Sequence, residues 1–339
     1  MHTISAGSVG EALALGLDIL SSPMSTSNEA SRNGGVTVLN GPMITTYQSP
    51  VRRVLFSPKR DANPFFHYFE ALWMLGGRND LEWLAQFNKQ MRSYSDDGGR
   101  TQPAAYGFRW RDYFGYDQID AVVEELRLHP ESRRAVLAMW DGFKDMGRVR
   151  LGSADVPCNT QCFFTIRNGL LNMAVTCRSN DALWGAHGAN AVHFSILQEY
   201  IAARIGVLMG TLTQFSWNYH IYDGILKHSM RDVIMDLFET DAYESGVVAP
   251  VYLFSPDDME LFDEELPHWL QAAAPGGHRY RPTHLALHLA DRMLAAWRHH
   301  KRGDYMSALA SLEPMPHLCD WRLACQQWLE RRLAKKEAA

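Results

Sequence analysis

Residues 157–177 read "PCNTQCFFTIRNGLLNMAVTC" and contain the clearest local structural signal of the chain. Two largely apolar runs flank Asn168-Gly169, a dipeptide that supplies the positive φ angles of a tight type I′ turn. The pattern predicts a β-hairpin, with Cys158 at the entrance of one strand and Arg178 at the exit of its partner. Because the turn pairs the two strands, we expect these two residues to lie close together.

The segments around the hairpin mix helices and strands without the βαβ alternation of a parallel sheet, so we predict an α+β fold. The clearest helix is "PFFHYFEALWML", with Asn63 as its N-cap, Pro64 in its first position and Gly76 just past its end. Further helices are expected at residues 80–91, 190–205, 283–299 and 304–336. Strands are expected at residues 36–39, 134–140 and 211–222.

Composition narrows the classes of function. The chain has 339 residues, of which 46% are hydrophobic and 21% charged, as in an ordinary globular protein. Its formal net charge of -5 argues against a protein that binds a nucleic acid backbone. No apolar run approaches the roughly 20 residues that span a bilayer. The N-terminal stretch does not have the pattern of a signal peptide. We expect a cytoplasmic protein with small-molecule partners and no membrane contact.

The five cysteines are odd in number, and a chain of this size does not need disulfide bonds. Cys158 and Cys162 are spaced C-x-x-x-C, but no second ligand pair completes a metal site, so no metal is expected. A lone cysteine is usually inert packing. A nucleophilic cysteine instead needs its thiolate, which nearby arginines stabilise while they also bind an anionic substrate. The hairpin brings Arg178-Ser179 to Cys158, which suggests an electrophile that carries a phosphate.

The residues together resemble the thymidylate synthase superfamily, which includes the pyrimidine nucleotide hydroxymethylases. The resemblance is carried by the hairpin with "RSNDALWGAHGANA" and by "FFHYFEALWMLGG", "AAYGFRWR", "ESRRAVLAMW" and "NYHIY". These motifs occur in the family's order and cover roughly residues 30–225. The resemblance implies a mixed sheet with surrounding helices over residues 1–260. Residues 261–339 would then form a helical C-terminal extension packed on the same domain.

The resemblance also implies a mechanism and its catalytic residues. Cys158 would add to C6 of a pyrimidine nucleoside monophosphate and turn C5 into a carbanion that attacks the one-carbon unit of methylenetetrahydrofolate. Tyr106 would help to remove the proton from C5. Glu70 would order water near the base and aid proton transfer. Asp181 would bind the pterin ring of the folate.

Further residues match the family's substrate ligands. Arg178, Ser179 and, in a more divergent region, Arg32 would bind the phosphate, and His220 and Tyr222 the ribose. Asn190 would read the edge of the pyrimidine, because an amide both donates and accepts hydrogen bonds. The resemblance also implies a homodimer with shared sites. The residues that would reach into the partner's site are Arg133 and Arg134.

Three departures from the family bear on the product and the base. Asn159 stands where thymidylate synthases usually carry histidine, so the choice between dUMP and dCMP stays open, as does that between ribose and deoxyribose. Residues 86–99 lack the tryptophan that methylating members place against the folate. The chain ends in a charged helix instead of a short apolar tail. Both of the latter features favour entry of water, and therefore a hydroxymethyl product.

Two other functions are possible alternatives to a hydroxymethylase. Thymidylate synthase would share the fold and the folate but give a methyl product. A non-catalytic nucleotide-binding relative would need neither a nucleophile nor folate ligands, so the joint presence of Cys158, Glu70, Tyr106 and Asp181 argues against it.

Overall fold

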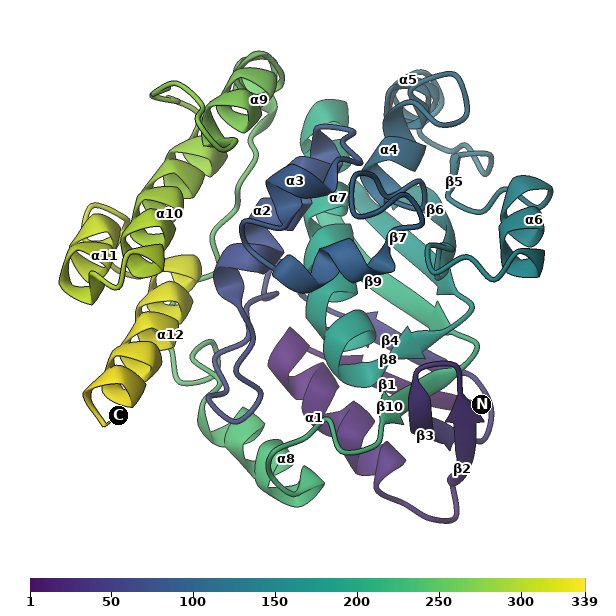
Figure 1. Ribbon diagram of the computed structural model, residues 1–339. Helices are drawn as coiled ribbons and strands as arrows, with labels where there is room; N and C mark the ends of the chain where they lie inside the picture. Colours follow the sequence, from purple (N-terminus) through teal and green to yellow (C-terminus); the bar gives the residue numbers. More distant parts are fainter. Residues whose placement is uncertain (339) are drawn as a thin grey trace.

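Two β-sheets and one long buried helix organise the fold (Figure 1). The computed structural model describes residues 1–338 and confirms the α+β class. The larger sheet has six strands in the order β1-β4-β9-β7-β6-β5. Its β1–β4 and β7–β9 pairs are parallel, and its other pairs are antiparallel. The strands are β1 (His2–Ala6), β4 (Met43–Tyr47), β9 (Leu208–Ser216), β7 (Leu170–Cys177), β6 (Asn159–Arg167) and β5 (Val136–Ala138).

The hairpin forms as the sequence predicts. Asn168 and Gly169 adopt φ angles of 52° and 74° and connect β6 to β7. The backbone N–H of Arg178 donates to the carbonyl of Cys158 at 2.9 Å, so the far ends of the two strands meet. The turn chemistry of two residues therefore sets the position of the cysteine.

A smaller sheet of four strands lies beside the first, in the order β2-β3-β10-β8. Its strands are β2 (Thr26–Ser31), β3 (Gly34–Leu39), β10 (Tyr219–Tyr222) and β8 (Asn180–Asp181). The prediction of one strand over residues 211–222 is wrong, because β9 ends at Ser216 and β10 belongs to the second sheet. The Asn218 carbonyl accepts the Asn180 N–H at 2.8 Å, so the chain beyond Ser216 pairs with β8 of the second sheet.

Helices surround the sheets and include the predicted α2, whose Asn63 side chain accepts from the Phe66 N–H. The α-helices are α1 (Val9–Leu20), α2 (Pro64–Leu75), α3 (Leu81–Leu84), α4 (Tyr106–Arg111), α5 (Gln118–Leu128), α6 (Lys144–Arg150), α7 (Asn190–Ile205), α8 (Met230–Glu239), α9 (Met259–Ala273), α10 (Leu285–Lys301), α11 (Tyr305–Leu312) and α12 (Asp320–Glu337). Shorter or irregular helical segments are η1 (Lys89–Tyr94), η2 (Ala182–Ala189) and η3 (Pro256–Asp258).

Three predicted elements differ from the structure in their extent. The helix expected over residues 80–91 divides into α3 and η1, because the Asn88 side chain accepts the Gln90 N–H and starts a new turn. The helix expected over residues 304–336 divides into α11 and α12 at Pro314 and Pro316, which cannot continue a helix.

The strand expected over residues 134–140 is only β5. The N–H groups of Met139 and Trp140 both donate to the carbonyl of Thr160, so the regular pairing with β6 ends there.

The two faces of the six-stranded sheet differ. Its inner face presents Leu171, Met173 and Val175 to α7, a helix that is buried along nearly its whole length. On the other face the alternate residues of β7 and β9 are half-buried, including threonines and Asn172. A sheet with one core face and one more polar face shows this alternation.

The helices α9–α12 gather on the side of the molecule away from β5 and α6 (Figure 1). They pack on α2 through aromatic contacts, with the Phe65 ring 5.5 Å from Trp297 and 5.6 Å from Trp328 between centroids. The predicted boundary between residues 260 and 261 falls in the first turn of α9. No helix within residues 1–338 has the length and apolar character needed to cross a membrane.

Candidate active site

A cavity of about 920 Å³ opens beside Cys158. The hairpin end, α2, α4, the start of α7 and the β2–β3 turn all contribute to its wall. The predicted site residues that line the cavity are Arg32, Glu70, Tyr106, Cys158, Arg178, Ser179, Asn190 and Tyr222. Residues from widely separated parts of the sequence therefore meet at one cavity.

Arg178 is the charged residue nearest to the thiol. Its Nη2 atom lies 3.7 Å from Cys158 Sγ, and its Nε donates to the Pro157 carbonyl at 2.9 Å. Burial raises the pKa of the Cys158 thiol, while Arg178 and Arg32 act in the opposite direction. The arginines favour the thiolate as the sequence analysis expects, but burial outweighs them in the net shift.

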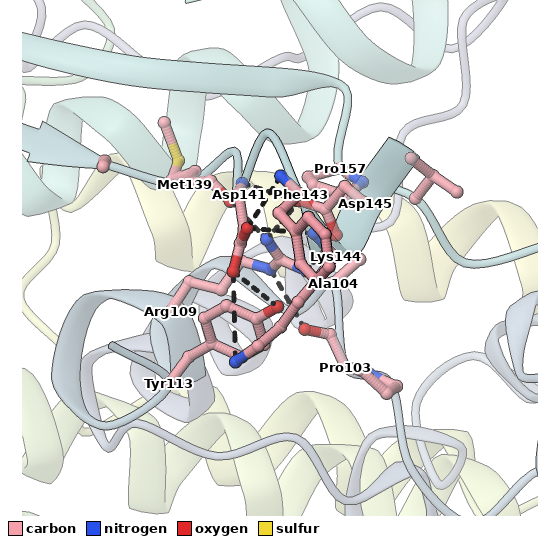
Figure 2. Close-up of polar contacts among 12 residues, drawn as sticks. Pro103, Ala104, Arg109, Tyr113, Met139, Asp141, Phe143, Lys144, Asp145 and Pro157 are labelled. Carbon is pink, nitrogen blue, oxygen red and sulfur yellow. Dashed lines mark hydrogen bonds and ion pairs between the residues drawn. The ribbon is translucent and has the colours of Figure 1, made fainter. Parts of the chain in front are cut away.

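A buried ion pair fixes the chain that leads to the nucleophile (Figure 2). Arg109 of α4 donates to both carboxylate oxygens of Asp145 in α6, at 2.6 and 2.7 Å, and to the Met139 carbonyl at 2.6 Å. Its Nε also donates to the Pro103 carbonyl at 3.0 Å. Both charged side chains are 0% exposed, so removal of either one would leave the other as an unpaired buried charge, which destabilises a fold. The contacts hold α4 and the segment before Cys158 in one geometry.

Tyr106, at the start of α4, contacts the strand that follows the nucleophile. Its hydroxyl oxygen accepts the Asn159 N–H at 3.1 Å. Burial raises the pKa of the Tyr106 phenol, and the nearby Cys158 acts in the same direction. The phenol is therefore neutral near pH 7 and can donate a hydrogen bond into the cavity.

A chain of amides fixes the orientation of Asn190. The Asn159 Nδ2 donates to Asn190 Oδ1 at 3.1 Å, and Asn190 Nδ2 donates to Asn180 Oδ1 at 3.0 Å. Asn180 in turn donates to Ser216 Oγ at 2.9 Å. The amide orientations are assigned from this network. Reversal of Asn190 would place its Nδ2 against the Asn159 donor and its Oδ1 against the Asn180 acceptor, so the network selects one of its two orientations.

Glu70 is buried in the wall of the cavity and faces His193 of α7. Its Oε2 lies 3.3 Å from His193 Nε2. Burial raises the pKa of Glu70 to about 8 and lowers the pKa of His193 to about 3. Desolvation thus favours the neutral form of both groups near pH 7.

Four predicted site residues do not line the cavity. Arg133 and Arg134 are exposed just before β5, and Arg134 pairs with Glu125 at 3.0 Å. His220 is buried in β10 with its ring 5.2 Å from that of Tyr222, in register with Asp181 of β8. The Oδ1 of Asp181 caps η2 by accepting the Trp184 N–H at 2.5 Å, and its Oδ2 is buried without a hydrogen-bond partner.

The cavity also contains residues that the sequence analysis did not assign to it. Met91 and Tyr94 of η1, Trp140 and His193 line its wall. Asp155 lies three residues before Cys158, and burial raises its pKa to about 6. A histidine inside an apolar helix was the available signal for His193. No sequence signal distinguished Asp155 from a surface carboxylate.

Comparison with known proteins agrees with the fold and the cavity. The sequence model described as thymidylate synthase matches residues 61–244. A deoxyuridylate hydroxymethyltransferase of Pseudomonas phage M6 is 44% identical over 318 residues, which are 91% of this chain and 88% of that protein. A second protein of that name, from Bacillus phage SP01, is 34% identical over 61% of this chain and 56% of its own length. A thymidylate synthase of Symbiobacterium thermophilum is 30% identical over 57% of this chain and 72% of its own length.

The fold, the cysteine-centred cavity and these relatives define an enzyme that transfers a one-carbon unit. The chain belongs to the thymidylate synthase family, as the resemblance of its motifs implies.

Proposed function

We propose that the enzyme hydroxymethylates C5 of deoxyuridylate, with methylenetetrahydrofolate as the one-carbon donor. The observation that carries the proposal is the 44% identity, over 91% of the chain, to a deoxyuridylate hydroxymethyltransferase. The cavity supports it, because a thiol, two arginines and a fixed amide surround one space. Five unpaired cysteines fit a reducing compartment such as the cytoplasm.

The nucleotide would lie with its phosphate at Arg178, Ser179 and Arg32. Arg32 lies in the β2–β3 turn and donates to the Ser153 carbonyl at 2.8 Å, so it already faces the loop before the nucleophile. Tyr222, with His220 behind it, would contact the sugar. A guanidinium can bind phosphate oxygens bidentately, which suits this end of the cavity.

The base would lie between Cys158 and Asn190. Asn190 uses one donor and one acceptor position in the amide chain, and each of its polar atoms has a further position for the base. One amide orientation complements the N3–H and O4 of uracil, and the reversed one complements cytosine. A fixed Asn190 would therefore bind one base better than the other, and the phage relative favours uracil.

Chemistry would start with addition of the Cys158 thiolate to C6, which makes C5 a carbanion. Arg178 would offset the cost of burying the thiolate. C5 would attack the methylene carbon of the folate, lose its proton near Tyr106, and leave an exocyclic methylene when the folate departs. Asp181 would bind the pterin ring. Its Oδ2 is buried without a hydrogen-bond partner, which leaves an acceptor for a donor group of the pterin.

The fate of the exocyclic methylene decides the product. Hydride transfer gives methyl, and addition of water gives hydroxymethyl. Residues 86–99 contribute Met91 and Tyr94 to the cavity but no indole, since the tryptophans in its wall are Trp73 and Trp140 of other segments. A phenol at this wall can hold a water by a hydrogen bond, which favours the hydroxymethyl product. Methylation, as in the thymidylate synthase relative, is the alternative.

Product mass tests the proposal. The purified enzyme would be incubated with methylenetetrahydrofolate and, separately, dUMP, dCMP and CMP, and each nucleotide would be analysed by mass spectrometry. We expect a hydroxymethyl increment on dUMP, with tetrahydrofolate as the second product. A methyl increment together with dihydrofolate would establish the alternative, and an increment on dCMP would correct the base.

We further propose that the enzyme is a homodimer with shared sites. The outer face of the six-stranded sheet, with Phe163 38% and Val136 40% exposed, would bind a second copy. Arg133 and Arg134 lie at the edge of this face, exposed and outside their own cavity, and would reach the partner's phosphate, Arg134 by leaving its ion pair with Glu125. A twofold interface of this kind uses the same surface in both copies.

Mixed dimers test the shared site. Neither Cys158→Ala nor Arg133→Ala homodimers should turn over well, because one lacks the nucleophile and the other a phosphate ligand. Random mixing should restore roughly a quarter of wild-type activity, since half of the dimers are mixed and each has one intact site. Verified mixed dimers without recovered activity would show that Arg133 does not act across the interface.

A further inference from the structure

The segment that leads to Asn190 is not a regular α-helix. In η2 the hydrogen bonds are those of a π-helix, and the Asn190 N–H donates to the Gly185 carbonyl. His187 (φ -110°, ψ 17°) and Gly188 (φ -115°, ψ -111°) depart from helical geometry just before Asn190. Short π-helical turns of this kind occur often at functional sites. Because the helical backbone is interrupted, other groups must hold η2 in place.

The imidazole of His187 is anchored at both of its nitrogens. Its Nδ1 lies 2.8 Å from the Tyr47 hydroxyl, and its Nε2 lies 2.8 Å from the Tyr219 hydroxyl. All three side chains are buried. The Tyr47 hydroxyl also donates to the Ala186 carbonyl at 3.0 Å. Gly16 of α1 closes over these rings, since a Cβ there would lie 2.2 Å from the Tyr219 hydroxyl.

One tautomer of His187 satisfies every donor of these three side chains. Tyr47 donates its one proton to the Ala186 carbonyl, so its oxygen accepts the Nδ1–H of His187. The Nε2 of His187 then accepts from the Tyr219 hydroxyl. The other tautomer would leave the buried Tyr219 O–H without an acceptor, because it has no further hydrogen-bond partner within residues 1–338. The tautomer is assigned from this network. Burial lowers the pKa of His187 to about 3, so the ring is neutral.

The anchored segment η2 lies directly against the amide chain that orients Asn190. A Cβ on Gly185 would lie 2.5 Å from Asn180 Oδ1 and 3.4 Å from Asn190 Nδ2. Gln214 connects the two parts, because its Nε2 donates to the Ala186 carbonyl at 3.1 Å and its Oε1 accepts from Asn180 Nδ2 at 3.4 Å. Movement of η2 would therefore displace both amides.

We infer that His187 is a positioning residue, which acts through η2 and Asn190 to set the choice between uracil and cytosine. The inference rests on the proposed place of the base between Cys158 and Asn190. Anchored by Tyr47 and Tyr219, His187 holds η2 against the amides, and Asn190 keeps the orientation that binds uracil. None of the three anchoring side chains lines the cavity, so their effect on the base passes through η2.

The variants Tyr219→Phe and Tyr47→Phe test the inference, because each removes one hydroxyl and keeps the aromatic packing. Calorimetry on the full-length proteins would give the dissociation constants of dCMP and dUMP. The ratio of dCMP to dUMP should fall about threefold in Tyr219→Phe, which loses one hydrogen bond, and about tenfold in Tyr47→Phe, which loses two. The kcat at saturating dUMP should stay within about twofold. A ratio equal to that of the wild type in both variants would overturn the inference.

Tyr68→Phe is the matched control. Tyr68 is 0% exposed, its hydroxyl donates to the Ala286 carbonyl at 2.8 Å, and it does not line the cavity. All three variants should melt about 2–4 °C below the wild type, but Tyr68→Phe should keep the wild-type ratio. An equal fall of the ratio in Tyr68→Phe would show that lost stability alone relaxes the choice of base, and would also overturn the inference.

A double variant tests whether the effect passes through Asn190. Asn159→Ala removes the donor that opposes reversal of Asn190, so addition of Tyr219→Phe should lower the ratio by less than about twofold more. Fully additive effects would contradict a shared route and overturn the inference. A methyl product from the wild type would overturn only the proposed function, since the dissociation constants do not depend on the product.

Discussion

Two buried glutamates, one in each part of the molecule, have opposite environments. Glu265 of α9 accepts hydrogen bonds from the Thr283 N–H and hydroxyl and from the His284 N–H, at 2.9 to 3.0 Å. Burial alone would raise its pKa, but these hydrogen bonds lower the pKa below its usual value. Glu70 has only the imidazole of His193 opposite it, and burial raises its pKa to about 8.

The hydrogen bonding of a buried carboxylate therefore indicates whether it has a structural or a chemical role in this fold. Among the helices α9–α12, the Glu265 carboxylate accepts hydrogen bonds from two backbone N–H groups and one hydroxyl, and so fixes the start of α10. In the family region, residues 61–244, a carboxylate of the same kind remains under-bonded beside a cavity. Perturbed carboxyl groups of the second kind cluster at sites of chemistry. Substitutions of the same kind in the two regions should therefore affect different quantities.

The largest contrast is expected between two cysteines. Cys158→Ala should reduce kcat below detection, because no other group can form the bond to C6. Nucleotide binding, measured by calorimetry, should persist. Cys325→Ala in α12 removes a thiol that is 0% exposed, and should cost about 1 kcal/mol of stability with kcat unchanged. Measurable turnover by Cys158→Ala would refute the covalent mechanism.

The contributions of Glu70 and Glu265 to the stability of the fold should depend on pH with opposite sign. Because the folded-state pKa of Glu70 is raised, its contribution to stability is present at acid pH and is lost as the pH rises toward 8. Glu70→Gln should match the wild type in melting temperature near pH 4 and exceed it above pH 8. Its kcat should fall about 10²- to 10⁴-fold.

Glu265→Gln should behave in the opposite way. Its lowered pKa stabilises the fold at neutral pH, and that contribution is lost as the pH falls below the unfolded value of about 4.5. At pH 7 the free energy of unfolding of the variant should be about 1–3 kcal/mol below that of the wild type, and its melting temperature should be lower. In acid the two proteins should become equally stable. Melting curves of both variants from about pH 3 to 9 would check these opposite pH dependences. Parallel curves would mean that the two carboxylates are equivalent.

The sequence predicts the features of the fold and the site that depend on local patterns. The Asn168-Gly169 turn, the N-cap of α2 and the motif resemblance were enough to predict the hairpin, the position of Cys158 at its far end and the α+β class. The contact of Glu70 with His193 was not predictable, because it depends on how α2 and α7 pack. Long-range burial likewise determines the pKa of Asp155, which no local pattern contains.

A smaller effect is expected at the amide chain. Asn159→Ala removes the donor that opposes reversal of Asn190, so cytosine nucleotides should compete better. The ratio of kcat/KM for dUMP to that for dCMP should fall roughly tenfold, the equivalent of one hydrogen bond. Asn172→Ala is the control, since its amide accepts the Thr211 N–H at 3.0 Å on β7 outside the cavity. An unchanged ratio would assign base choice to other groups.

The smallest effect is expected where the two regions meet. Arg332 of α12 donates to both carboxylate oxygens of Asp61, at 2.7 and 3.0 Å, and its guanidinium lies 3.5 Å from the centroid of the Trp328 ring. Both charged side chains are partly exposed, at 21% and 30%, so screening by water limits the pair. Arg332→Ala should cost about 1 kcal/mol of stability, and less at high salt.

Arg332→Lys refines this last comparison, because lysine keeps the charge but cannot donate bidentately or stack in the same way. It should recover only part of the lost stability. Turnover per folded molecule should be equal in the wild type and both variants, since the pair joins α12 to the segment before α2 and does not line the cavity. A fall in kcat at unchanged stability would show that α12 takes part in closing the site. The C-terminal helices would then belong to the catalytic machinery as well as to its support.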